Sequence, residues 1–143
     1  MIDIANRLCE AVEEFIKLHS KEVNWKHRSA PGKWSAIEII GHLTDSAVVN
    51  LHRFVRCNYD DDFTLNYLQN DWVKAQHYHE ADIDELLSLW QLLNHRIIIV
   101  WRKFPVERLQ AKCNGQTVEN LGKDYLAHLR HHLNQIVHLK AGN

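Results

Sequence analysis

The chain has 143 residues, of which 45% are hydrophobic and 24% charged, and its net charge is −1 with histidine neutral. This composition is typical of a globular domain with a sizeable core, so we expect a single domain over residues 1–143. The near-neutral charge argues against the strongly basic surface of a nucleic-acid-binding protein, and we expect no nucleic-acid partner.

Neither the cysteines nor the apolar runs indicate an exported or membrane protein. Cys9, Cys57 and Cys113 are odd in number and form no Cys-x-x-Cys pair, which is typical of a reducing compartment. The N-terminus lacks the pattern of a signal peptide, and apolar runs such as residues 97–101 are too short to cross a bilayer. We therefore expect a cytoplasmic protein with no membrane partner.

A first helix is expected over about residues 3–20. Ile4, Leu8 and Val12 recur at helical spacing, and Asp3 is the candidate N-cap. A polar stretch with a Pro-Gly turn signal follows over residues 21–33.

The second helix has the clearest start in the chain. Ser35 and Glu38 form a capping-box pattern, and the helix should run to about Cys57. Polar and acidic residues 58–62 predict a break. Residues 63–79 hold either a short helix or an irregular connection.

A third helix should start near Asp82, where Asp82 and Glu85 form a second capping-box-like pair, and end at Pro105, because proline cannot continue a helix. The Asn-Gly pair within residues 113–117 predicts a tight turn or a small hairpin. Thr117 is then the expected cap of a last helix that reaches about Lys140.

Four long helices without a long strand or a repeat favour an all-α fold, a four-helix bundle that buries four apolar stripes. The long connection between the second and third helices allows a crossover in place of a simple up-and-down order. The residues expected to lead the buried stripes are Leu8, Val12, Ile39, Leu43, Leu86, Trp90, Ile97, Leu129 and Ile136.

His128 and His132 are the most informative residues in the chain. They lie four residues apart on the last helix, so both imidazoles project from one face at a spacing that suits a single metal ion. His42 on the second helix is the best candidate for a third ligand. A three-histidine site would leave at least one coordination position open, as catalytic metal sites do. His131 lies off this face and is expected outside the site.

Each of these histidines also has a plainer interpretation. Eleven histidines make one His-x-x-x-His pair unremarkable, and His42 could instead be a core histidine bonded to a carbonyl. The preceding Gly41 costs helix stability, which suggests that something approaches the helix closely there. Asp45, one turn further on, is a candidate hydrogen-bond acceptor that orients a metal ligand, or a general base, or else a solvated acid.

Two polar residues flank the histidine pair on the last helix. Asp124 precedes His128 by four residues, and Gln135 follows His132 by three. Either could orient an imidazole by a hydrogen bond, or simply face solvent. Other familiar sites are excluded, because the chain has no Glu-x-x-His, His-Glu-x-x-His, Gly-x-Ser-x-Gly or phosphate-binding glycine loop.

Three segments of the chain form an ordered set of motifs. They are Trp34-Ser-Ala-Ile-Glu-Ile-Ile-Gly-His-Leu-Thr-Asp45, Asn50-Leu-His-Arg-Phe-Val-Arg56 and Asp124-Tyr-Leu-Ala-His-Leu-Arg-His-His-Leu-Asn-Gln-Ile136. Together they resemble the DinB/YfiT-like metalloenzymes. Each segment is loose alone, but the ordered set frames most of the chain.

The resemblance implies a four-helix bundle with a crossover, and frequently a homodimer. It implies that His42, His128 and His132 bind a divalent metal, often nickel or zinc. Characterised relatives include transferases and an isomerase that use low-molecular-weight thiols such as mycothiol or bacillithiol. The expected partner is therefore a small-molecule substrate, for which such a thiol is one candidate.

Two functions remain open at this point. The first is a metal-dependent enzyme, either a hydrolase or a thiol-dependent transferase, in which the metal generates hydroxide or thiolate near neutral pH. The second is a non-catalytic helical bundle that binds a ligand or a partner protein. No cysteine lies near the histidine motifs in sequence, so a nucleophile from the protein itself is not indicated.

Overall fold

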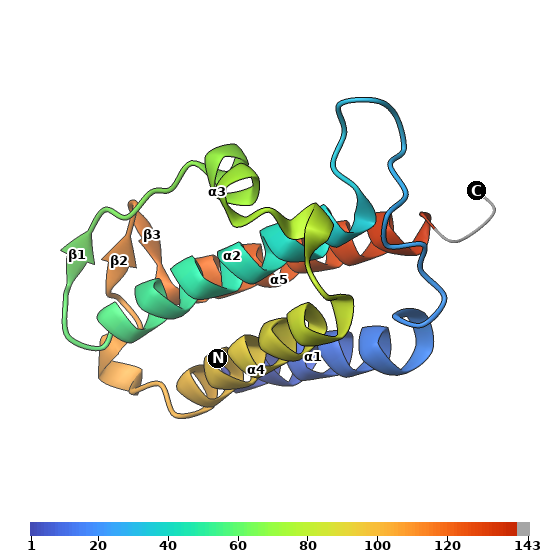
Figure 1. Cartoon of the computed structure of the whole chain (residues 1–143). Helices are drawn as coiled ribbons and strands as arrows, with labels where there is room; N and C mark the ends of the chain where they lie inside the picture. The colour runs from blue at the N-terminus through green and yellow to red at the C-terminus, as the bar shows by residue number, and fades with distance from the viewer. Residues whose placement is uncertain (140–143) are drawn as a thin grey trace.

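The computed structural model describes residues 1–139, and in these residues four long helices form a bundle (Figure 1). The long helices are α1 (Ile2–Glu14), α2 (Ala36–Arg56), α4 (Ile83–Arg102) and α5 (Val118–Val137), with a shorter α3 (Gln69–Gln76) beside them. The prediction of an all-α four-helix bundle is confirmed. No helix of the described residues is long and apolar enough to cross a bilayer.

The order of the helices includes a crossover. α1 and α2 each pack against both α4 and α5. Figure 1 shows α2 and α4 running in the same direction, because the chain returns along the bundle between them. This return segment, residues 57–82, carries α3 and lays it against α2. The long connection therefore makes the crossover that its length allowed.

The expected caps of three helices are confirmed. Ser35 and Glu38 form the complete capping box of α2, with both reciprocal hydrogen bonds present. The Asp82 side chain accepts from a backbone N–H at the start of α4, and Thr117 does the same at the start of α5. These short polar side chains satisfy amides that have no partner within the helix.

The prediction that Asp3 caps the first helix is wrong. Helix α1 begins one residue earlier, after Met1, and Asp3 lies within its first turn, where it pairs with Arg7. The regular helix also ends at Glu14, and a π-helical turn continues it over Phe15–His19. A carboxylate in the first turn still interacts favourably with the helix dipole.

The expected hairpin forms from β2 (Lys112–Cys113) and β3 (Gln116–Thr117). Asn114 and Gly115 both have positive φ, as a two-residue type I′ turn requires. A third short strand that the sequence did not indicate, β1 (Asp62–Phe63), pairs in parallel with β2. Two residues are too few to show the alternation that marks a strand.

The core lies between the four long helices. All of the residues expected to lead the apolar stripes are buried, with exposures of 5% or less. Helix α5 ends at Val137, and Lys140, where the last helix was expected to end, lies outside the described residues.

Candidate metal centre

The three candidate ligands lie together where α2 packs against α5. One nitrogen from each of His42, His128 and His132 lies within 4.8 Å of the others. The closest pair is Nε2 of His42 and Nε2 of His128, 3.1 Å apart. Residues 86 positions apart in the chain thus meet at one point, because the two helices that carry them are neighbours.

Helix geometry accounts for the arrangement of the rings. His128 and His132 lie one turn apart on α5, and their ring centroids are 4.6 Å apart. The ring of His42 approaches from α2, with its centroid 5.0 Å from that of His128 and 4.9 Å from that of His132. His131 is exposed and is not one of the three, as its position on the helix predicted.

Burial keeps the cluster neutral. Burial, together with the neighbouring imidazoles, lowers the pKa of His42 to about 3 and the pKa of His128 to about 4. The pKa of His132 is also lowered, chiefly by burial. Three uncharged imidazoles at neutral pH have lone pairs available for a cation.

Gln135 orients one of the rings. Its Oε1 lies 2.9 Å from Nδ1 of His132, and because an amide oxygen only accepts, Nδ1 carries the proton. The lone pair of His132 is then on Nε2. The suggestion that Gln135 orients an imidazole therefore agrees with the geometry. Asp124 makes no such bond to His128 within residues 1–139, and its side chain is exposed.

These residues fit a divalent cation. Imidazole nitrogen suits zinc and nickel, and three such ligands leave coordination positions open. The Nδ1 atom of His42 is buried without a hydrogen-bond partner in the described residues. The alternative of a core histidine bonded to a carbonyl is therefore not what the structure has. Because Nδ1 has no partner, only Nε2 of His42 is left to bind a cation or to make a hydrogen bond.

Asp45 is completely buried beside the cluster, so the interpretation as a solvated acid is wrong. Its Oδ1 accepts hydrogen bonds from Tyr78 at 2.6 Å and from Gln76 at 3.1 Å. Burial raises the pKa of this carboxyl group, although both hydrogen bonds act in the opposite direction. Asp45 therefore links α2 to the return segment and makes no hydrogen bond to His42 in the described residues.

Gly41 makes this link possible. A Cβ atom at Gly41 would lie 2.2 Å from Cδ2 of Tyr78, so any side chain there would collide with the tyrosine ring. The close approach suggested by a glycine inside an apolar helix is therefore that of Tyr78. Sequence reasoning identified the glycine but not its partner, because Tyr78 lies in a segment without a clear pattern.

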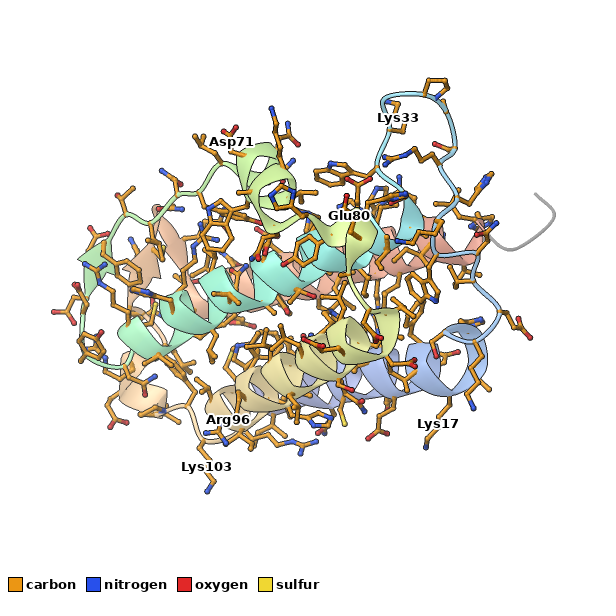
Figure 2. All side chains as sticks on the ribbon, in the orientation of Figure 1. Lys17, Lys33, Asp71, Glu80, Arg96 and Lys103 are labelled. Atoms are coloured by element: carbon orange, nitrogen blue, oxygen red, sulfur yellow. The ribbon has the colours of Figure 1, made fainter. Side chains whose placement is uncertain are left out.

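A cavity opens beside His132 of the histidine cluster. Its volume is about 770 Å³, and its wall includes His132, Gln135, Trp34 and Lys33. The indole of Trp34 packs against the ring of His42, with centroids 4.9 Å apart. Figure 2 shows Lys33 on the loop that projects from the end of the bundle beside this cavity.

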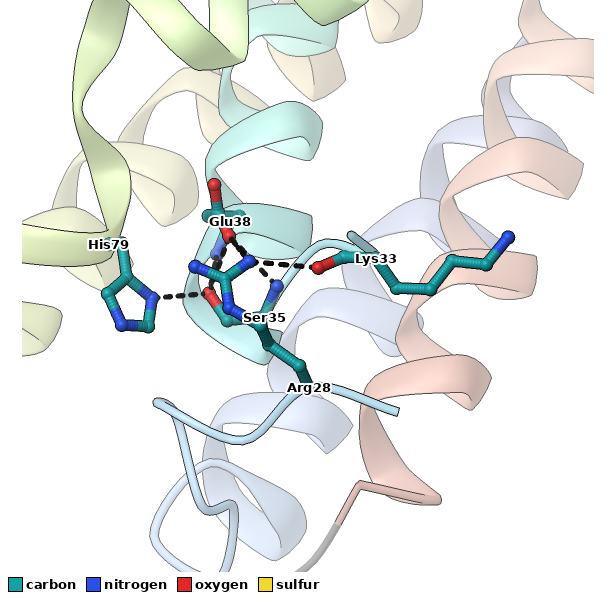
Figure 3. A network of polar contacts seen from close by, with 5 residues as sticks. All are labelled: Arg28, Lys33, Ser35, Glu38 and His79. Atoms are coloured by element: carbon teal, nitrogen blue, oxygen red, sulfur yellow. Dashed lines mark hydrogen bonds and ion pairs between the residues drawn. The ribbon is translucent and has the colours of Figure 1, made fainter. Parts of the chain in front are cut away.

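A polar network holds this loop on the bundle (Figure 3). Arg28 donates to the carbonyl of Lys33 at 2.8 Å and pairs with Glu38 of α2. The Ser35 hydroxyl lies 2.8 Å from Nδ1 of His79 in the return segment. The loop that carries Trp34 is thereby fixed against the ring of His42.

Comparison with known proteins agrees with this architecture. The family model of the DinB superfamily matches residues 6–136. Among solved structures, YfiT from Bacillus subtilis matches with a TM-score of 0.79 and 19% identity, covering 96% of this chain and 82% of that one. YfiT is described as a probable metal-dependent hydrolase with an unusual four-helix bundle topology. No curated protein sequence matches the chain significantly.

Proposed function

The chain belongs to the DinB superfamily, and we propose that it is a metal-dependent hydrolase whose divalent cation is held by His42, His128 and His132. The observation that carries the proposal is the convergence of three neutral histidine nitrogens within 4.8 Å beside a large cavity. The description of YfiT as a probable metal-dependent hydrolase supports the same reaction class. Zinc and nickel are the cations that best suit such ligands.

Held by His42, His128 and His132, a divalent cation would lower the pKa of water, or of a thiol, and would so supply a nucleophile near neutral pH. Three neutral imidazoles add no negative charge that would weaken this effect. Gln135 keeps the lone pair of His132 on Nε2. The cavity beside His132 gives a small-molecule substrate access to the cluster, and Trp34 covers the His42 ring.

Asp45 is more suitable as a positioning residue than as a general base. Its Oδ1 is occupied by Tyr78 and Gln76, and the carboxyl group is shielded from solvent. A general base must reach the proton that it removes. We assign to Asp45 the role of holding the return segment against α2, at the turn that follows His42.

The test begins with the metal content of untagged protein, because a histidine tag would add ligands. We expect about one zinc or nickel ion per chain after loading, a content that falls severalfold in His132→Ala but not in His131→Ala. The two variants lose the same side chain at adjacent positions of α5, so they control for each other. Equal, full metal content in both would contradict the assignment.

Activity assays then separate the reaction classes. Loaded protein is mixed with a panel of small esters and amides, with and without a low-molecular-weight thiol. Cleavage without thiol, lost in His132→Ala, supports a hydrolase. A reaction that occurs only with thiol supports the thiol-dependent transferase instead. Failure of the protein to bind zinc or nickel would favour the non-catalytic ligand-binding or partner-binding bundle.

A further inference from the structure

A second, smaller cavity adjoins the histidine cluster. Its volume is about 260 Å³, and His128 forms part of its wall. Gln69 lines both this cavity and the larger one that opens at His132. The two cavities therefore flank the cluster, and a molecule in the smaller one lies next to the candidate metal centre.

The smaller cavity is lined by an arginine without an anionic partner. Arg53 is half-buried, and no carboxylate within residues 1–139 forms an ion pair with it. Its charge acts on the nearby Cys113 thiol, but burial raises the pKa of that thiol, so it stays neutral. Asp124 also lines the cavity, but it is exposed and does not pair with Arg53. A partly buried cation normally has a counter-ion.

The guanidinium is held in place by neutral acceptors. Nε and Nη2 of Arg53 donate to the carbonyl of Leu65, and Nη1 donates to Oδ1 of Asn50 at 3.2 Å. Asn114 in the hairpin fixes Leu65 with two further hydrogen bonds, of 2.9 and 3.1 Å. Three of the five N–H groups of the guanidinium are used in this way. The other two have no oxygen acceptor in the described residues, and the guanidinium also lies within hydrogen-bonding reach of the Cys113 thiol.

We propose that Arg53 binds a carboxylate of the substrate while the bond to be cleaved lies at the histidine cluster. This inference rests on the proposed hydrolase function. A planar guanidinium fork matches a carboxylate in two parallel hydrogen bonds, and a fixed fork loses little entropy on binding. The substrate class is therefore small carboxylic acids that carry an ester or amide bond a few atoms away.

The first test needs no metal. Wild-type protein is titrated with succinate, and with neutral succinamide at the same ionic strength, while the Arg53 Nε–H signal is followed by NMR. We expect a saturating shift with succinate and none with succinamide. Equal shifts with both compounds, or no shift with succinate, would overturn the proposal. Tighter binding of inorganic phosphate than of succinate would overturn the assignment to a carboxylate.

Variants then locate the effect. Arg53→Gln should weaken succinate binding at least tenfold, and Arg53→Lys, which keeps the charge but not the fork, should weaken it less. The control is Arg96→Gln, which removes the same charge from an exposed position on α4, far from α3 in Figure 2. A similar loss in Arg96→Gln would mean that net charge alone is responsible, and would overturn the proposal.

A final comparison separates this inference from the function on which it rests. Zinc-loaded protein is titrated with acetohydroxamate, a small metal ligand, and with the monohydroxamate of succinic acid, which adds a carboxylate. We expect the carboxylate to improve affinity at least tenfold, and Arg53→Gln to remove this advantage without changing acetohydroxamate binding. Equal affinity of the two ligands overturns the role of Arg53 alone. Binding of neither ligand overturns both proposals.

Discussion

The buried carboxyl group of Asp45 makes a hydrogen bond that holds the fold together, but its burial disfavours the charged form of the group. Its hydrogen bond to Tyr78 fixes the return segment, but burial raises its pKa and so opposes its ionisation in the folded protein. The unfolded chain therefore releases this proton at a lower pH than the folded chain does. Folded-state stability from this residue falls as the pH rises above about 4, the ordinary pKa of aspartate.

We therefore predict opposite outcomes for two substitutions of Asp45. Asp45→Asn keeps an oxygen acceptor for Tyr78 and Gln76 and removes the charge, so its free energy of unfolding at pH 7 should equal or exceed that of the wild type. Asp45→Ala leaves the buried Tyr78 hydroxyl without a partner and should cost about 1–3 kcal/mol. Urea denaturation at pH 7 measures both. An Asn variant as unstable as the Ala variant would show that the charge itself is needed.

Gly41 and Gly122 provide a matched pair of helix glycines. Gly41→Ala should destabilise the protein by about 1–3 kcal/mol, because its Cβ would overlap the ring of Tyr78, and this exceeds the gain in helix propensity. In Gly122→Ala the added Cβ meets the flexible end of Met1 at 3.2 Å and makes ordinary contacts with Ile4 and Trp101 at 3.7 Å, so the variant should be neutral or stabilised by up to about 1 kcal/mol. Thermal unfolding of both variants checks the prediction. Equal effects would show that propensity alone decides.

At the scale of single residues, the sequence predicted the histidine cluster but not the residues around it. His128 and His132 share one helix, so their spacing alone places them together. The neighbours of Arg53 include the hairpin, and those of Tyr78 belong to α2. In both cases these segments are distant in the chain, and no local sequence pattern predicts such contacts. Gly41 was the only sequence signal of a close approach, and it did not name the residue that approaches.

At the scale of elements, the sequence predicted the helix caps because they depend on residues within one turn. The boundaries of α2, α4 and α5 agree with their capping residues to within a few positions. The strand β1 was not readable, since it is two residues long and exists only through its pairing with the hairpin.

Substitution of Ser35 should destabilise the protein more than loss of an ordinary helix cap, because the Ser35 side chain also contacts His79. We predict that Ser35→Ala lowers the free energy of unfolding by about 1–2 kcal/mol. Thr117→Ala is the control, since Thr117 caps α5 through a single bond of 3.5 Å, and it should cost less, about 0.5–1 kcal/mol. Chemical denaturation gives both values. A larger loss in the Thr117 variant would contradict the importance of the network in Figure 3.

At the scale of the whole molecule, the crossover is what assembles the site. The return segment runs back along the bundle, so α2 and α4 are parallel neighbours, and α5 lies against α2. The length of this connection suggested the crossover, while the pairing of α2 with α5 followed from the need to bring His42 to the other histidines. A simple up-and-down order allows other helix pairings, so the helix pattern alone did not determine the neighbours.

The family resemblance leads us to predict that the protein is a homodimer. Apolar side chains remain exposed on the outer faces of α2 and α4, and burying them against a second copy would be favourable. The exposed residues concerned are Val48, Val55, Leu89, Leu92 and Ile99. Light scattering at micromolar concentration should therefore give twice the chain mass of 16.9 kDa.

A dilution series is the control, because a specific dimer dissociates to the monomer mass at a defined concentration, whereas aggregation gives no such plateau. A mass of 16.9 kDa at all concentrations would show that these side chains stay exposed to solvent in the functional protein.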